Sequence, residues 1–197
     1  MKQTFGMFFA MCALAAMPAL AQTKPAPSKT PPSKPAAAQH ADQAKGAGPD
    51  AAFAKEAAVG GMAEVELGNL AKEKASNNDV KQFGDRMVTD HSKANDELKQ
   101  WASQKKVTLP EKLDQKHQAT RDRLAKLSGA AFDREYMHEM VMDHQQDVAA
   151  FTRESKTGKD PDLKAWAGKT LPTLQDHLKM AKDTASKVGM GHTTAKK

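Results

Sequence analysis

The chain has 197 residues and a formal net charge of +6, and its one cysteine, Cys12, lies in an apolar run near the amino terminus. If that run is removed as a leader, disulfides and thiolate ligands are excluded, and histidine, carboxylate and methionine are left to bind a metal. Much of the positive charge lies in the terminal segments. Between them Lys and Arg alternate with Asp and Glu, so the sequence predicts solvated helix faces and no nucleic-acid partner.

The two terminal segments are not expected to join the folded domain. Residues 1–21 combine one basic residue, an apolar run and Ala-Leu-Ala before Gln22. This is the pattern of a signal peptide, so we expect a periplasmic or cell-envelope protein with no transmembrane segment after cleavage. Residues 22–49 are rich in Pro, Ala and Lys, which predicts a disordered basic linker that associates weakly with the envelope. Residues 50–188 form the predicted domain, and residues 189–197 a flexible tail.

The predicted domain should be all-α. From Asp50 onward Ala, Leu, Lys, Glu, Gln and Met dominate, and runs of β-branched residues with period two are absent. The expected helices, in chain order, span 50–76, 78–105, a shorter one from a Thr108 cap to Gly129, 130–157 and 161–188. Each long helix has about 27 residues and a length of roughly 40 Å. The pattern predicts four long helices in a bundle, with the short helix in the connection between the second and third.

Two local features of these helices lead to further predictions. Small residues, among them Gly60, Gly61 and Gly68, share one face of the first helix. That face should let the first helix approach its neighbours closely. Pro172 interrupts the last helix and removes one backbone hydrogen bond, so a kink is expected there.

Each long helix has one polar residue in the middle of its apolar face. These residues are Glu64, His91, His144 and His177. Since each lies near the midpoint of its helix, the four side chains should meet at one level of the bundle. Imidazole and carboxylate ligands suit Zn, Fe, Mn or Cu, so the pattern predicts a metal site made by these four residues.

An aspartate precedes each of the three histidines. These are Asp90, Asp143 and Asp176. They are candidates for hydrogen bonds to the metal ligands, or for charges on the helix surface. By contrast, Glu66, His117 and His138 fall on polar helix faces and are expected to point away from the site.

Two alternatives remain open. The four polar residues could form a metal-free layer that fixes helix register, in an envelope or outer-membrane protein that binds partners or supports stress tolerance. Copper handling is the second alternative, because thioethers favour Cu(I) and three methionines flank His138 and His144. The three are Met137, Met140 and Met142. Methionines at helical spacing also commonly fill gaps in a core.

Catalytic motifs are missing from the sequence. It contains no nucleophile elbow, phosphate loop, nucleotide fingerprint or catalytic triad spacing, so no catalytic residue is assigned. Any enzymatic activity would then be metal-dependent and oxidase-like. The oligomeric state is not predicted.

Four segments, in order, resemble the bacterial family known as domain of unknown function 4142. They read GGMAEVELGNLA, MVTDHSKANDEL, FDREYMHEMVMDH and LPTLQDHL, within about residues 51–183. The resemblance implies a ferritin-like antiparallel bundle and an exported location, and it implies no established activity. The motif segments contain Glu64, His91, Asp143, His144 and His177.

The sequence departs from di-iron ferritins at the metal ligands. Those proteins use two Glu-x-x-His motifs and two further glutamates. Here the only such motif is Glu135 to His138, on the polar side of its helix. A ferroxidase-type centre is therefore not predicted.

Overall fold

Residues 48–190 are described by the computed structural model, and their secondary structure is entirely helical. The long helices are α2 (Pro49–Lys74), α3 (Asn78–Lys105), α5 (Gly129–Thr157) and α6 (Pro161–Ala185), with the short α4 (Gln115–Ala125) between α3 and α5, and a π-helical turn, η1 (Ser186–Met190), after α6. The all-α prediction is confirmed. The predicted signal peptide, almost all of the predicted linker and the last residues of the tail lie outside the described residues.

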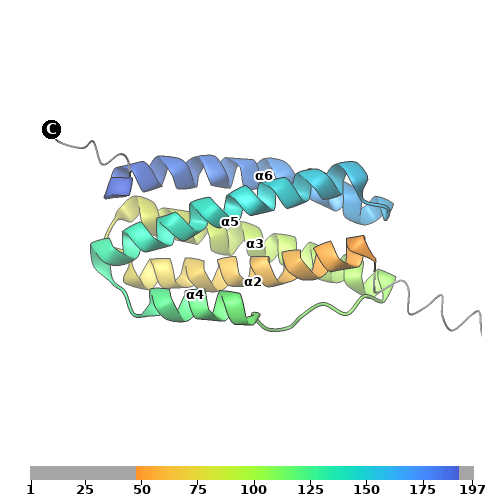
Figure 1. The fold of residues 1–197 in the computed structure, drawn as a ribbon, viewed down its shortest axis with the longest axis horizontal. Helices are drawn as coiled ribbons and strands as arrows, with labels where there is room; N and C mark the ends of the chain where they lie inside the picture. The colour runs from red at the N-terminus through yellow and green to blue at the C-terminus, as the bar shows by residue number, and fades with distance from the viewer. Residues whose placement is uncertain (1–47, 191–197) are drawn as a thin grey trace, which may run out of the picture. The chain divides into compact units, whose positions relative to one another are not determined.

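The four long helices lie side by side and form a bundle (Figure 1). Helix α2 packs against α3 and α5, and α6 packs against α5 and α3. Both sequential pairs, α2 with α3 and α5 with α6, are antiparallel (Figure 1). The connection from α3 to α5 returns along the bundle and contains α4, which packs against α2 and α5. One long crossover of this kind also connects ferritin-like bundles, and the relation to ferritins stays a prediction.

The start of the short helix differs from the prediction. Thr108 does not begin a helix, and the first helical residue is Gln115. The side chain of Asp114 caps α4 by accepting a hydrogen bond from the backbone N–H of His117 at 2.9 Å. Val107 is buried and Leu109 packs against the core, so these contacts hold the preceding segment along the bundle in a non-helical conformation.

The loop between α2 and α3 is held by a carboxylate from α5. Asp133 is buried, and its side chain accepts hydrogen bonds from the backbone N–H groups of Ser76 and Asn77, both at 3.0 Å, and from the Ser76 hydroxyl. These N–H groups precede the first turn of α3, where a helix offers no partner of its own. Asp133 therefore ties the start of α3 to α5.

Close helix packing occurs at two glycines of α2. A Cβ at Gly68 would lie 2.7 Å from the Gly84 carbonyl oxygen of α3, and one at Gly61 would collide with the Asn95 side chain. Gly60, in contrast, faces open space. The expected close approach therefore occurs at Gly61 and Gly68, and at Gly60 the prediction is wrong. Helix α6 continues through Pro172 up to Ala185.

The core is divided into two apolar clusters, one toward each end of the bundle. The first includes Phe53, Leu98, Trp101, Phe151, Leu163, Trp166 and Leu174, and the second includes Leu67, Phe83, Met87, Phe132, Tyr136, Met140 and Ala181. Every long helix contributes to both clusters. Glu64, His91, His144 and His177 fall between the two sets of positions on their helices. The buried polar residues therefore form a layer in the middle of the bundle.

Candidate metal centre

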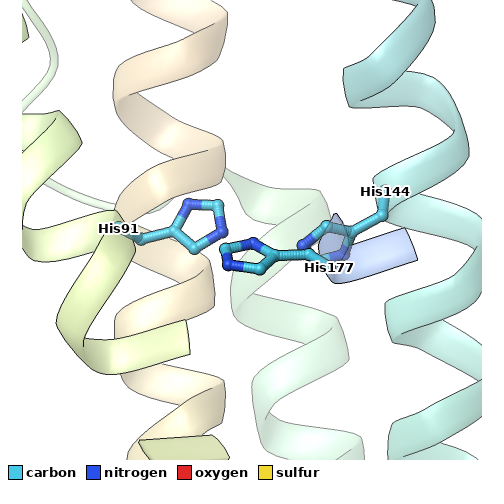
Figure 2. A group of neighbouring side chains, drawn as sticks. All are labelled: His91, His144 and His177. Carbon is cyan, nitrogen blue, oxygen red and sulfur yellow. The ribbon is translucent and has the colours of Figure 1, made fainter. Parts of the chain in front are cut away.

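Three histidines from three helices meet in this layer. His91 of α3, His144 of α5 and His177 of α6 point toward one another (Figure 2), and their ring centroids are 5.4–5.7 Å apart. All three side chains are buried. One ring nitrogen from each lies within 4.8 Å of the other two. The structure thus brings together three of the four predicted ligands.

Hydrogen bonds on the outer side of two rings determine which nitrogen faces inward. His177 Nε2 lies 2.8 Å from Asp90 Oδ2, and His144 Nδ1 lies 2.9 Å from the Met140 carbonyl oxygen. Both oxygens are acceptors, so each of these nitrogens carries the proton and donates it. The lone pairs of His177 Nδ1 and His144 Nε2 are then directed toward the other histidines.

Asp90 has a second hydrogen-bond partner besides His177. Its carboxylate also accepts a hydrogen bond from the Arg86 guanidinium. Burial opposes ionisation, but the hydrogen bonds from Arg86 and His177 outweigh it and hold the pKa of Asp90 below its usual 3.8. An ionised Asp90 fixes the orientation of the His177 ring, as carboxylates commonly do for metal-binding histidines.

The inward nitrogens have no hydrogen-bond partner in the described part of the chain. His91 Nε2, His144 Nε2 and His177 Nδ1 are all buried and unsatisfied. Burial lowers the pKa of each imidazole, to about 4 for His144, and the neighbouring histidines lower that of His91 further. The rings are therefore neutral near pH 7, which is the form that binds metals. Buried polar groups nearly always have a hydrogen-bond partner, so we expect these nitrogens to have a ligand.

The spacing of the nitrogens can be compared with what an ion requires. A tetrahedral ion bound at 2.0–2.1 Å holds its nitrogen ligands roughly 3.3–3.4 Å apart. The observed limit of 4.8 Å is wider, and small side-chain rotations would close the difference. Three histidines with one open position is also the ligand number of many catalytic zinc sites.

Glu64, the fourth predicted ligand, is buried but lies on the other side of His144. Its Oε1 is 3.7 Å from His144 Nδ1, the nitrogen bonded to Met140, and it is not part of the set of converging ligand atoms. Burial first, and then the charges of Asp143, Asp147 and Glu139, raise the pKa of Glu64 well above 4.5. Both carboxyl oxygens lack a hydrogen-bond partner. As a metal ligand Glu64 stays a prediction that requires its side chain to move.

The three aspartates that precede the histidines have different surroundings. Asp90 bonds to His177, across the interface between α3 and α6. Asp143 is half-buried, and burial, with Glu139 nearby, raises its pKa. Asp176 is exposed. Within residues 48–190 neither Asp143 nor Asp176 forms a hydrogen bond with a histidine, so only Asp90 has the geometry of a partner to the site.

The residues expected to point away from the site are found elsewhere. Glu66 is exposed and pairs with Arg121 at 2.8 Å, His117 of α4 bonds to the capping residue Asp114, and His138 is exposed. The methionines of the copper alternative also separate. Met137 and Met140 pack in the second apolar cluster and Met142 is exposed, so the three do not share a face.

Other polar residues near the histidines were not singled out from the sequence. Asp147 and Asn95 line a small cavity together with His91. Asp147 follows His144 by three residues, and this helical spacing could have suggested a position near the site. Asn95 gave no such signal, because its placement depends on the small residue Gly61 of α2, against which it packs.

Within residues 48–190 no helix combines the length and hydrophobicity that crossing a membrane requires. A solved structure of a DUF305 protein from Streptomyces coelicolor, thought to be secreted, is similar to this one with a TM-score of 0.62. The two chains are 15% identical, and the match covers 74% of this chain and 96% of that chain. At this identity the likeness shows the helical fold alone.

The remaining comparisons concern sequence. No curated protein matches the chain. The profile of the family described as Domain of unknown function (DUF4142) matches residues 35–184, which begins inside the predicted linker and includes all five helices apart from the last residue of α6. The four motif segments predicted this result, and the chain belongs to the DUF4142 family.

Proposed function

We propose that the bundle binds one transition-metal ion through His91, His144 and His177. The observation that supports this most strongly is the set of three buried, neutral ring nitrogens that converge without a hydrogen-bond partner among the described residues. A layer that only fixed helix register would be expected to bond its polar atoms to one another. An ion would satisfy all three lone pairs at once.

The ligand chemistry indicates which ions are favoured. Imidazole suits Zn, Cu, Fe and Ni, and among divalent ions a nitrogen site generally binds Cu²⁺ most tightly. Manganese prefers oxygen ligands, so it would require the Glu64 carboxylate. Export of the protein, predicted from the first 21 residues, would give the site access to metal ions of the periplasm or cell envelope.

The direct test is metal binding by the full chain, without an affinity tag and after removal of bound metal. Titration with Cu²⁺ or Zn²⁺ should give one ion per chain. The electron paramagnetic resonance spectrum of the Cu²⁺ form should show coupling to imidazole nitrogen. Absence of binding at micromolar concentration, or a site without nitrogen ligands, would contradict the proposal and favour the register-fixing layer.

Replacing a ligand should weaken binding without unfolding the bundle. In His144→Leu an apolar side chain fills the buried position, and affinity should fall by more than about 100-fold, since even partners outside the ligand set contribute 10–100-fold. His138→Leu removes an exposed histidine of the same helix and should leave affinity unchanged. Helical content and thermal unfolding identify any variant that does not fold. Metal retained after replacement of His91, His144 and His177 together would place it elsewhere.

The Asp90 carboxylate offers a second measurement at the same site. Asp90→Asn should weaken metal binding by about 10–100-fold, because the neutral amide no longer fixes the proton on His177 Nε2. Asp176→Asn is the matched control, since Asp176 adjoins His177 in sequence but is exposed. Equal effects of the two substitutions would show that general electrostatics, and not the hydrogen bond of Asp90, controls the affinity.

A further inference from the structure

A small cavity adjoins His91, one of the three proposed ligands. It has a volume of about 20 Å³, and its polar lining comes from His91, Asn95, Asp147, Trp166 and Thr170. A cavity needs about 10–15 Å³ and two to four polar partners to hold one water molecule. This cavity therefore has room for a ligand of that size and little more.

Two of the lining side chains carry buried polar atoms without a partner. They are His91 Nε2, which can accept a hydrogen bond or bind a metal, and Trp166 Nε1, which can only donate. Trp166 Nε1 is notable because a buried indole N–H usually finds an acceptor. The Thr170 hydroxyl donates to the Trp166 carbonyl oxygen at 2.9 Å and keeps its lone pairs free to accept. Residues that carry donor and acceptor groups thus line one water-sized space.

We propose that this cavity holds an exchangeable fourth ligand of the metal ion, a water molecule, which accepts a hydrogen bond from Trp166. The inference rests on the proposed metal site and adds what completes its coordination. Three histidine ligands leave one position of a tetrahedral ion open, as in zinc sites that bind a water or a substrate. An ion with such an open position differs from a purely structural one, whose four positions all belong to the protein.

The ligand can reach solvent past Asn95. This residue lines the cavity and also two surface grooves, of about 500 and 270 Å³, beneath the segment that connects α3 to α4. Its side chain packs directly on Gly61, where a Cβ would collide with Asn95 Oδ1. Asn95 is thus shared by the cavity and both grooves, and rotation of its side chain would let the water exchange while the bundle stays folded.

Pulsed electron paramagnetic resonance of the Cu²⁺-loaded full chain, exchanged into D₂O, tests this. Wild-type protein should show imidazole nitrogen couplings together with strong deuterium modulation from a directly bound water. Ala94→Val and Ala57→Val add methyl groups to the cavity lining from two helices, α3 and α2. Each should keep the nitrogen couplings and reduce the deuterium modulation by at least about half, since the two added methyl groups compete with the water for a space that holds little more than one water molecule.

The outcomes separate the two proposals. Absence of the nitrogen couplings would contradict the proposed metal site itself. Nitrogen couplings without deuterium modulation in the wild type would leave the metal site in place and overturn the water ligand. Unchanged deuterium modulation in both cavity-filling variants would likewise overturn it, because the water would then lie outside this cavity. Two variants on different helices are used so that a folding defect in one still leaves a decisive measurement.

Discussion

At about pH 7.5 the metal-free Asp147→Asn variant should be more stable than the wild type by about 2–4 kcal/mol. Burial, and secondarily the Asp143 carboxylate, raises the pKa of Asp147 from 3.8 to about 7, while Lys116 of α4 acts in the opposite direction. A rise of this size corresponds to about 4 kcal/mol, at 1.36 kcal/mol per pKa unit. Asp147 is only half-buried, so screening by water reduces the figure toward the lower bound.

The sign of the effect follows from where the proton is bound. Below about pH 4 Asp147 is protonated in both the folded and the unfolded protein, and its contribution is favourable and constant. Between pH 4 and about 7 the folded state holds a proton that the unfolded state has released, so stability falls as pH rises. Above about pH 7 Asp147 is ionised in the folded protein as well, and the full cost of burying its charge is present. Because an asparagine does not ionise, the variant lacks this fall of stability with rising pH.

Urea unfolding at pH values from 4.5 to 8 would measure how the stability difference between the two proteins depends on pH. The free energy of unfolding of the variant, relative to the wild type, should rise with pH and then level off above pH 7. Asp176→Asn is the control, because Asp176 is exposed and a surface substitution usually changes stability by less than about 0.5 kcal/mol. A pH-independent difference for Asp147→Asn would show that Asp147 is solvated and does not face the interior.

Asp133→Ala should destabilise the protein by about 2–4 kcal/mol. The substitution leaves the backbone N–H groups of Ser76 and Asn77 without the carboxylate that accepts their hydrogen bonds at 3.0 Å. Loss of a cap costs about 0.5–2 kcal/mol, and each buried group left unsatisfied about 1–3 kcal/mol. The two contributions overlap, because the same N–H groups are involved, so the sum stays within the stated range.

The cap of α4 provides the comparison. Asp114 accepts a hydrogen bond from the His117 N–H and also contacts the His117 ring, but it is exposed, so Asp114→Ala should cost about 1 kcal/mol or less. The midpoint of urea unfolding for each variant, with the slope unchanged, gives the two values. If both substitutions cost the same, the contact between Asp133 and the loop would not hold the start of α3 in solution.

Helix period and helix length determined most of the fold at the level of sequence. Apolar residues at a spacing of 3.6 identify one buried face on each long helix, and similar lengths place His91, His144 and His177 near the midpoints. These are local properties, so they could be predicted without knowing which helices are neighbours. The family was also evident from four short segments.

The tertiary structure alone decided how the site is built. The three Asp-His pairs look equivalent in sequence, but consecutive residues on a helix point about 100° apart, so an aspartate cannot serve the histidine that follows it. Asp90 instead bonds to His177, a contact across 87 positions of sequence. Whether Asp143 or Asp176 found such a partner depended on which helix faced it.

The same reason explains the position of Glu64 and the beginning of α4. Sequence placed Glu64 at the right level and on the buried face, and the rotation of α2 against α5 directs it to Nδ1 of His144. The Thr108 cap was locally plausible, and contacts of Val107 and Leu109 with the core prevailed over it. A helical pattern fixes the level and face of a side chain, but the atom that it meets is set by the packing of distant segments.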